Sequence, residues 1–352
     1  MKRLHYFIML LPMLFLYACD VHEWPDKPEK VQFTIKLNYE LDMTKWQHRY
    51  DGKKLIELGL GETYDNSRKK GEIRYIVRAY PILKNQLVAQ DYTNEFVFKK
   101  DISEGYAQEM TLELAPGDYS IVVWSDLVEN SNVTPYYNAN AFEEISLQGE
   151  HAACNDYRDA FRGRGNISLV SDIVESSPCK IEINMQRPLA KFEFITSDLT
   201  EFIRKETARL KKYNALKSPS DDEPVPSKVR IEDYEVVFSY VGFMPNRYSI
   251  FTDKPVDSAT GVVFRTSLKS GDNNETSIGF DYVFVNGTES SVTIQIGICD
   301  PDGQCISLTD PIKVPLKRSH HTIIGGRFLT AETSGGVIIN PDFDGDYNII
   351  FQ

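Results

Sequence analysis

The most regular feature of this chain is an alternation of apolar and polar residues. Between residues 31 and 41 every second position, from Val31 to Leu41, is apolar, and the positions between are polar. A period of two predicts a β-strand with one buried face. Shorter runs with the same period lie at residues 72–79, 110–114, 119–123, 181–185, 190–194, 236–240, 292–298, 337–339 and 347–351.

Residues that favour turns separate these runs, and few helical patterns occur between them. Many short strands divided by Gly, Pro, Asn and Asp predict an all-β, mainly antiparallel fold of β-sandwiches, rather than a parallel α/β sheet. Ala115-Pro-Gly-Asp118 lies between the runs 110–114 and 119–123 and predicts a hairpin there.

One helix is predicted, starting at Asp198. Asp198 and Glu201 have the spacing of a capping box, the apolar residues that follow share one face, and Lys211 and Lys212 suit the C-terminal end. Residues 214–228 then form a polar loop interrupted by prolines.

A domain boundary is expected near Arg187-Pro188, where one strand ends and a second series opens. The chain of 352 residues is long enough for two domains. We therefore predict two tandem β-sandwich domains, residues 31–186 and 187–352, with one short helix in the second.

The start of the chain predicts export. Lys2 and Arg3 precede an apolar run over residues 7–18, which is too short for a membrane span of about 20 residues. Leu16-Tyr-Ala-Cys19 resembles the lipobox of bacterial lipoproteins, which implies a signal peptide over residues 1–18 and lipidation of Cys19. Residues 19–30 would then be a tether at the outer membrane. An ordinary secretory signal with an incidental cysteine is the alternative.

The charge of the chain excludes two classes of partner. The formal net charge is −12, and no basic run is longer than Arg68-Lys69-Lys70. A surface that binds phosphates needs a cationic patch. Nucleic acid and anionic lipid surfaces are therefore not expected partners.

Four cysteines follow Cys19, and two of them flank a Pro-Asp-Gly turn. Cys299 and Cys305 could face each other across a hairpin and form a disulfide after export. Their spacing is not typical of zinc sites, and no histidine lies nearby. Two reduced, packed cysteines are the remaining alternative.

No catalytic or cofactor motif is recognisable. Of the six histidines only His320 and His321 are adjacent, and neighbours on a strand point to opposite faces. Asp342 begins a calcium-loop-like run, but the twelfth position of such a loop falls beyond Gln352. We predict a protein that is not an enzyme and has no metal or cofactor.

Besides the lipobox, five short segments follow one another along the chain: 114–126 (LAPGDYSIVVWSD), 136–138 (YYN), 157–161 (YRDAF), 187–191 (RPLAK) and 314–318 (VPLKR). In this order they resemble a known family, the fimbrillin-like lipoproteins of the Bacteroidetes. The resemblance covers residues 30–352 and implies two transthyretin-like sandwiches. It also implies a role as a shaft, tip or anchor subunit of surface pili.

The resemblance also implies how subunits would associate. In such pili one subunit donates a strand to a groove of the next, and a trypsin-like protease opens the groove by cutting after the first strand. Arg49 is the best-placed residue for such a cut, and Lys45 is second. Alternatively, residues 31–41 form a permanent strand, as an anchor would require, and residues 347–351 are another candidate donor. Ser258, in Asp-Ser-Ala, resembles the acceptor of O-glycans in these bacteria.

Aromatic residues leave a second function open. They could stack on sugars, which would make the protein a glycan-binding lipoprotein with host or bacterial surface ligands. Packing in the core is the more common explanation of aromatics near strand ends. The residues concerned are Trp24, Trp46, Trp124, Tyr136 and Tyr137.

Overall fold

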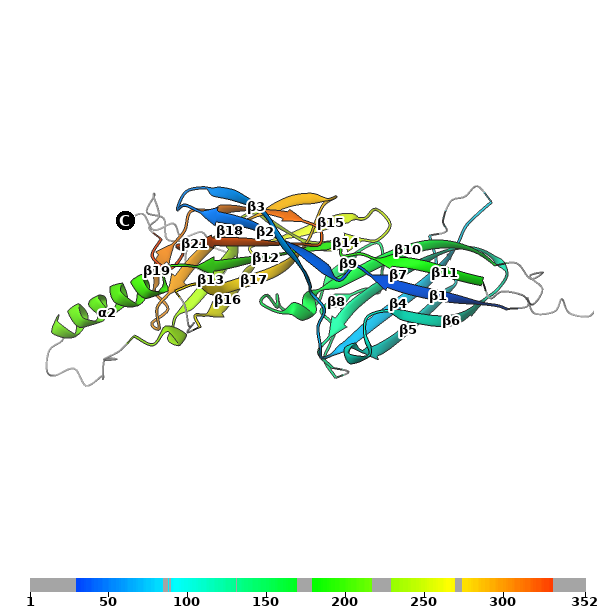
Figure 1. Ribbon diagram of the computed structural model, residues 1–352, viewed down its shortest axis with the longest axis horizontal. Helices are drawn as coiled ribbons and strands as arrows, with labels where there is room; N and C mark the ends of the chain where they lie inside the picture. The colour runs from blue at the N-terminus through cyan, green and yellow to red at the C-terminus, as the bar shows by residue number, and fades with distance from the viewer. Residues whose placement is uncertain are drawn as a thin grey trace, which may run out of the picture.

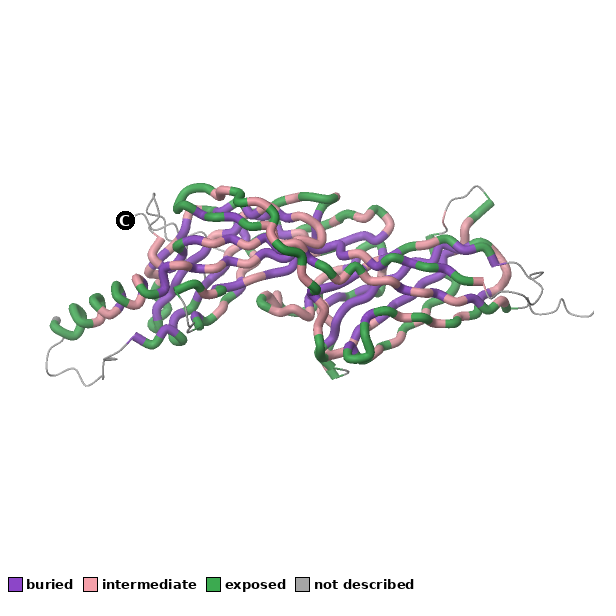
Figure 2. The backbone as a smooth tube through the Cα atoms, viewed as in Figure 1, coloured by how far each residue is buried: buried purple, intermediate pink, exposed green. Residues whose placement is uncertain are grey.

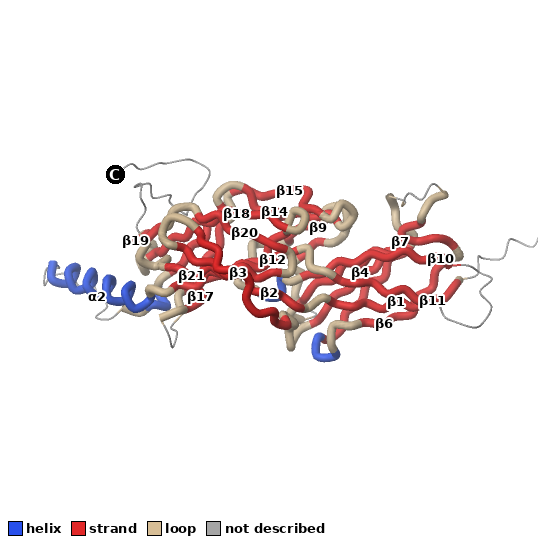
Figure 3. Tube along the Cα trace, turned by 45° about the horizontal axis from the view of Figure 1, so that its top comes forward, coloured by secondary structure: helices blue, strands red, loops and turns tan. Residues whose placement is uncertain are grey.

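Two β-sandwich lobes lie end to end along the long axis of the molecule (Figure 1). The structure is a computed structural model, and it describes residues 30–84, 88, 90–130, 132–169, 179–216, 229–269 and 274–331. Strands dominate the described residues, and α2 is the α-helix among them (Figure 3). The predicted all-β, mainly antiparallel fold is confirmed.

The first lobe, here the N-lobe, consists of two sheets packed face to face. Its smaller sheet has the order β11-β1-β6 and its larger sheet the order β10-β7-β4-β5. Side chains of both sheets form one hydrophobic core, which includes Phe33, Tyr75 and Phe161. The strands are β1 (Val31–Tyr39), β4 (Glu72–Pro81), β5 (Asn94–Asp101), β6 (Gln108–Leu114), β7 (Gly117–Val128), β10 (Ala160–Leu169) and β11 (Cys179–Met185).

The second lobe, the C-lobe, has a five-stranded sheet of order β17-β12-β21-β2-β3. The facing sheet has the order β16-β13-β18-β19, and β20 also pairs with β18. The strands are β2 (Asp42–Tyr50), β3 (Leu55–Asp65), β12 (Leu189–Thr196), β13 (Glu235–Tyr240), β16 (Val263–Ser267), β17 (Thr276–Phe284), β18 (Glu289–Cys299), β19 (Cys305–Leu308), β20 (Ile312–Lys317) and β21 (His320–Gly326).

A third cluster of buried side chains joins the lobes. A sheet of order β15-β14-β9-β8 lies beside the outer face of β4 and β7, and Trp124, Tyr137, Tyr248 and Phe284 pack together there. Figure 2 shows buried backbone continuing from one lobe into the other. The strands are β8 (Tyr137–Asn138), β9 (Ile145–Leu147), β14 (Phe243–Ser249) and β15 (Lys254–Thr260), and short 3-10 turns cover Ile102–Glu104, Asp156–Arg158 and Ile231–Asp233.

Strand pairing crosses the predicted boundary at residue 187. After β1, the chain enters the C-lobe as β2 and β3 and then returns to the N-lobe as β4, and β2 pairs in parallel with β21. β9 likewise pairs with β14. The division into domains 31–186 and 187–352 stays a prediction. All strands of the two N-lobe sheets lie before residue 187, whereas the C-lobe combines β2 and β3 from before it with strands from after it.

The strand predicted over residues 31–41 is present as β1, which ends two residues earlier, at Tyr39, before β2 begins at Asp42. The hairpin predicted at residues 115–118 is wrong: β6 pairs with β1, whereas β7 pairs with β4 and β10. The burial of both faces of β7 distinguishes it from the alternating β6, because β7 lies between the N-lobe core and the cluster that joins the lobes.

The predicted helix is present as α2 (Leu199–Leu216), but its N-terminus is held differently. The carboxylate of Asp198 accepts hydrogen bonds from Thr330, 2.9 Å from its backbone N–H. Instead, the Thr200 N–H donates to Oδ1 of Asn274, at 2.9 Å. Leu199 and Phe202 are buried in the C-lobe core, whereas the far end of α2 is exposed (Figure 2).

Candidate functional site: the first strand and the lobe junction

β1 is the central strand of the smaller N-lobe sheet. It pairs in parallel with β11 from Phe33↔Cys179 to Tyr39↔Met185, and antiparallel with β6 from Val31↔Leu114 to Leu37↔Gln108. Its inward side chains Phe33, Ile35 and Leu37 are fully buried. Burial of three such side chains contributes roughly 5–9 kcal/mol before ordering costs. Removal of β1 would therefore separate β6 from β11 and open the N-lobe core.

The outward face of β1 is polar and contributes little to its attachment. Lys36 pairs with Glu182 at 3.1 Å, and Gln32 donates to Glu113 at 2.8 Å. Exposed pairs of this kind contribute about 0–1 kcal/mol each. The buried face of β1 therefore supplies most of the energy that holds it in the sheet.

A buried arginine fixes the point where β1 leaves the N-lobe. The guanidinium of Arg187 donates to the backbone carbonyls of Glu40 (2.9 Å), Leu41 (2.8 Å) and Asp42 (3.0 Å). Its Nε lies 2.9 Å from both carboxylate oxygens of Asp159. Each of the three guanidinium nitrogens thus has an acceptor, which offsets the free-energy cost of burying the charge. We call Arg187, Asp159 and the carbonyls of residues 40–42 the crossover clamp.

A second buried ion pair lies deeper in the C-lobe. Arg158 contacts Asp281, whose carboxylate also accepts from Tyr240 at 2.6 Å and lies 2.6 Å from Nε2 of His151. Burial alone would raise the pKa of the Asp281 carboxyl, but the charge of Arg158 and the hydrogen bonds from His151 and Tyr240 lower it below its ordinary value. The pair therefore keeps its charges inside the protein.

A third pair holds the N-lobe against β8. Asp126, fully buried, accepts from Nε of Arg74 at 2.9 Å and from the Trp124 indole at 3.0 Å. Arg74 also donates to the carbonyl of Tyr137 at 2.9 Å. Here burial dominates, and it raises the pKa of Asp126 above its ordinary value despite these donors.

Asp253 links both lobes through two arginines. Nη2 of Arg162, from β10 of the N-lobe, lies 2.9 Å from one carboxylate oxygen, and Nη1 of Arg318, from the C-lobe, lies 2.7 Å from the same oxygen. Asp253 occupies a left-handed backbone conformation, with φ 56°, which aims its side chain at both. The five ion pairs and the aromatic cluster make the lobe junction a continuous, packed interface.

The junction explains most of the sequence motifs that carried the family resemblance. Trp124 and Asp126, Tyr137, residues 158–161, Arg187 and Lys191, and Arg318 all lie in it. Their chemistry is structural: paired charges, satisfied donors and packed rings. The motifs therefore specify how the lobes join, and they do not converge on an open pocket.

The two residues proposed for proteolytic processing lie inside a strand. Lys45 and Arg49 are on β2, which pairs with β3 on one side and β21 on the other. Lys45 forms an ion pair with Glu62, and Arg49 is exposed. Sequence reasoning missed Lys53 and Lys54, which are exposed in the turn after β2 and are more accessible to a protease. The dipeptide Asp51-Gly52, which favours a turn, is the sequence feature that indicates an exposed segment at Lys53 and Lys54.

The remaining predicted sites are dispersed. Cys19 and the strand at residues 347–351 lie outside the described residues. Ser258 is exposed on the edge strand β15. Cys299 and Cys305 are register partners with Sγ atoms 2.8 Å apart, and both thiols are unbonded. Cleavage, O-glycosylation, lipidation and the disulfide all stay predictions.

The aromatic residues divide into two groups. Trp124 and Tyr137 are fully buried, so core packing accounts for them. Tyr136 is half-buried, and so is Trp46, which donates to Glu57 at 2.8 Å. Trp24 lies outside the described residues. Two of the four described candidates for a sugar platform are therefore interior.

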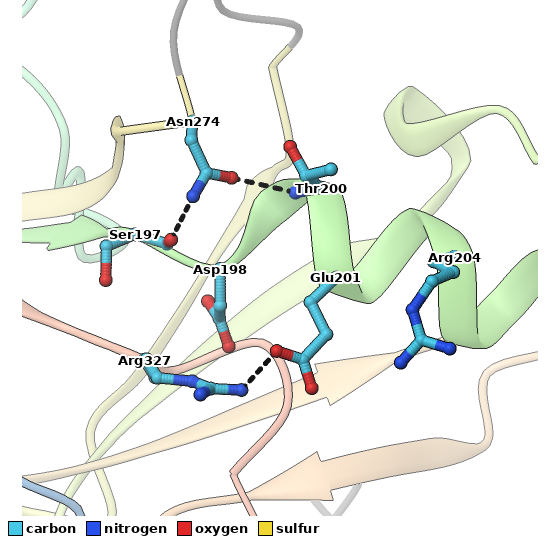
Figure 4. A pocket seen from close by; sticks show the side chains of 7 residues that line it. All are labelled: Ser197, Asp198, Thr200, Glu201, Arg204, Asn274 and Arg327. Atoms are coloured by element: carbon cyan, nitrogen blue, oxygen red, sulfur yellow. Dashed lines mark hydrogen bonds and ion pairs between the residues drawn. The ribbon is translucent and has the colours of Figure 1, made fainter.

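An open pocket lies at the N-terminus of α2 (Figure 4). It has a volume of about 440 Å³, and its side chains largely satisfy one another: Arg327 pairs with Glu201, and Asn274 bridges Ser197 and Thr200. The exposed Arg204 lies at its rim. Acid, amide and base are mixed here, and the buried carboxylate among them, Asp198, accepts hydrogen bonds from Thr196 and Thr330.

The described residues lack two further features. None of the helices there is long and apolar enough to cross a membrane. That part of the chain also holds no cluster of three or more His, Cys, Asp or Glu side chains able to bind a metal ion.

The chain is similar to several proteins of known structure. It is similar to a fimbrial anchor protein, Mfa2, from Porphyromonas gingivalis (13% identity, 79% of this chain and 82% of that one, TM-score 0.36). It is also similar to a fimbrial assembly protein from Parabacteroides distasonis (10% identity, 86% and 94%, TM-score 0.35). A third is a candidate polysaccharide-binding protein from Bacteroides thetaiotaomicron (11%, 79% and 80%, TM-score 0.41).

The sequence matches none of the curated proteins. One family description matches residues 26–352, nearly the whole chain. The chain therefore belongs to the family of unknown function DUF6562.

Proposed function

We propose that this protein is a non-catalytic, lipid-anchored subunit of a surface fibre that assembles by strand exchange. The observation that carries the proposal is the position of β1, which completes the N-lobe sheet between β6 and β11 through a fully buried apolar face. A sheet built in this way can accept an equivalent strand from another chain. The buried charges of the described residues are used in packing, which favours a structural role.

The proposed location is the outer membrane, with the protein exposed at the cell surface. Export and lipidation of Cys19 account for the apolar start and the lipobox of the sequence. Several acyl chains hold a protein persistently, at about 0.8 kcal/mol per buried methylene. Residues 19–30 would lift the N-lobe off the lipid surface.

The structure favours a subunit that keeps its first strand. Cutting at Lys45 or Arg49 would require β2 to leave both β3 and β21, and the crossover clamp would have to open as well. A subunit at the membrane must keep the segment that joins it to its lipid. We therefore place the chain at the base of a fibre, where the donor strand predicted at residues 347–351, which lie outside the described residues, or a strand of a partner subunit would complete the joint.

A glycan-binding lipoprotein is the alternative function. Stacking on sugars needs exposed aromatic faces, and the described residues bury Trp124 and Tyr137. This observation makes the alternative the weaker candidate.

The proposal is tested in the native host with three versions of the chain. Fibre subunits joined by strand exchange resist detergent, so unboiled gel electrophoresis of outer membranes should show high-mass species that contain the native chain. Cys19→Ser should release the protein from the membrane, and a chain ending at residue 331 should fold but lose the high-mass species. Only monomers in every sample, or full retention of Cys19→Ser on the membrane, would overturn the proposal.

A further inference from the structure

The hairpin between β18 and β19 brings two cysteines into register. Cys299 and Cys305 are paired residues, and the next pair inward to the turn is hydrogen-bonded, from the Asp300 N–H to the Gln304 carbonyl at 2.9 Å. The register shifts between Ile298 and Cys299, so the cysteines face each other on the turn side of an irregularity in the ladder. Facing residues of an antiparallel pair have Cα atoms about 4.5–5.5 Å apart, within the range that a disulfide spans.

The turn between the cysteines is organised by a buried carboxylate. Asp300 is 4% exposed, and its Oδ1 accepts from the Asp302 N–H at 3.1 Å and the Gln304 N–H at 2.9 Å. Gly303 supplies the left-handed residue of the turn, with φ 80°. This arrangement fixes the direction of Oδ2, which points at α2.

The helix α2 uses this turn as a docking point. Nη2 of Arg209 lies 3.0 Å from Oδ2 of Asp300, and its Nε lies 2.9 Å from Glu206, which also accepts from Tyr234 at 3.0 Å. α2 and β19 lie at the same end of the C-lobe (Figure 1), and the ion pair between Arg209 and Asp300 joins the helix to the turn before β19. The position of the middle of α2 therefore depends on the geometry of the Cys299–Cys305 hairpin.

We infer that Cys299 and Cys305 form a disulfide that locks this hairpin and thereby fastens α2 to the C-lobe. The sulfur atoms are 2.8 Å apart before any bond forms, so closure needs little movement of the backbone. The bond would hold the turn that carries Asp300 in the geometry that Arg209 requires.

The chemistry of closure assigns different roles to the two thiols. Burial and the neighbouring thiol raise the pKa of Cys299 to about 12, and Cys299 is buried, whereas Cys305 is half-exposed. Cys305, as a thiolate, attacks the disulfide of an oxidising dithiol–disulfide exchange protein and releases one of its sulfurs as thiolate. Cys299 then loses its proton, attacks Cys305 and expels the second thiolate. Two thiols are oxidised, and the exchange protein's disulfide is reduced to a dithiol.

Peptide mapping tests the pairing directly. Trypsin leaves both cysteines in one peptide, residues 270–313, while Cys154 and Cys179 lie in other peptides. Alkylation of the denatured, unreduced protein should label Cys154 and Cys179 and leave peptide 270–313 unlabelled, with full labelling after reduction. The full-length protein purified from membranes and equilibrated with oxidised glutathione is the decisive sample. Labelling of peptide 270–313 in that sample would overturn the inference.

A comparison with protein alkylated in intact cells separates this inference from the proposed export. A peptide that is labelled in cells but protected after oxidised glutathione would count against export to an oxidising compartment and would support the pairing. Protection of the peptide in both samples supports the disulfide pairing and also the proposed export.

Hydrogen exchange tests the link to α2. Reduction, or Cys299→Ser, should accelerate amide exchange over residues 204–216 on the order of tenfold, because the docking turn loses its constraint. Cys179→Ser is the matched control and should leave α2 unchanged on a pairing-intact background. If amide exchange in α2 is the same in Cys299→Ser as in the native protein, the link between the hairpin and α2 is refuted, even when peptide mapping shows the disulfide in the native protein.

Discussion

Arg187 and Asp159 face each other inside the lobe junction, with Nε of the arginine 2.9 Å from both carboxylate oxygens and neither side chain more than 1% exposed. The same guanidinium holds the carbonyls of residues 40–42. One side chain thus joins the end of β1, the start of β2 and the N-lobe loop before β10.

Replacing Arg187 should destabilise the whole molecule. Arg187→Met keeps the volume but leaves Asp159 charged, buried and without its main partner, and loses three bonds to the crossover. We expect the free energy of unfolding to fall by about 3–5 kcal/mol, measured by urea denaturation. Arg247→Met, whose arginine pairs with Glu144 and Asp257 at the surface, should cost less than about 1 kcal/mol. Equal effects for the two variants would contradict a special role of the clamp.

Limited proteolysis should show whether trypsin cuts in the turn after β2 or within β2 itself. Trypsin needs an extended, unpaired segment, so we expect the native protein to be cut after Lys53 or Lys54 well before Lys45 or Arg49. Mass spectrometry of the early fragments identifies the sites. In Arg187→Met, cuts within β2 should become faster relative to the native protein. Early cleavage at Arg49 in the native protein would restore the model in which β1 is released.

The contributions of the buried Asp281 and Asp126 to the free energy of unfolding should depend on pH in opposite directions. The lowered pKa of Asp281 means that its contribution to stability is present above about pH 4 and is lost as the pH falls through its folded pKa. The raised pKa of Asp126 means that its contribution is present at acid pH and is lost as the pH rises through its folded pKa.

The matched variants Asp281→Asn and Asp126→Asn test these signs. Relative to the native protein, Asp281→Asn should lose about 3–5 kcal/mol at pH 7 and less near pH 3.5, because Arg158 loses its buried partner. Asp126→Asn should lose less at pH 7 than near pH 3.5. Urea denaturation at both pH values measures the differences, and the same sign of change in both variants would show that the assigned shifts are wrong.

A glycine in β10 lets the two N-lobe sheets meet at their edge. A Cβ on Gly163 would lie 2.6 Å from Ile183 and Met185 of β11 and 3.0 Å from the Asn184 carbonyl. Gly163→Ala should therefore displace β11, the partner of β1, and lower the free energy of unfolding by about 1–3 kcal/mol. Gly297→Ala is the control, because its Cβ would meet Leu308 at an ordinary 3.5 Å. Thermal unfolding that changes as little for Gly163→Ala as for the control would refute this explanation.

Sequence periodicity predicted the strands but not their partners. Alternation placed β1, β4, β11 and β18 correctly because burial of one face leaves a period of two in the sequence. Nothing in a local window states that β1 lies between β6 and β11, or that β2 belongs to the other lobe. Pairing is decided by packing between segments that are far apart in the chain.

The junction shows the same limit for side chains. Arg187 and Asp159 each lie in a short motif, but charged residues are usually solvated, so their burial against each other has no local signature. Asp198 likewise has the sequence context of a helix cap, yet Thr330, from a loop beyond β21, takes its carboxylate. The Asp198 carboxylate therefore binds a donor that is distant in the sequence, Thr330, in place of the N–H groups at the start of α2.

The direction of β1 has a mechanical consequence. β1 runs along the long axis, from the outer end of the N-lobe to the junction (Figure 1), and it is hydrogen-bonded on both sides. Tension applied at its N-terminal end acts along the strand, so the bonds to β6 and β11 bear the load together instead of opening one by one. A force that pulls on the N-terminal end of β1 therefore loads both ladders in shear. Arg187, which binds the carbonyls of residues 40–42, links the other end of β1 to the C-lobe.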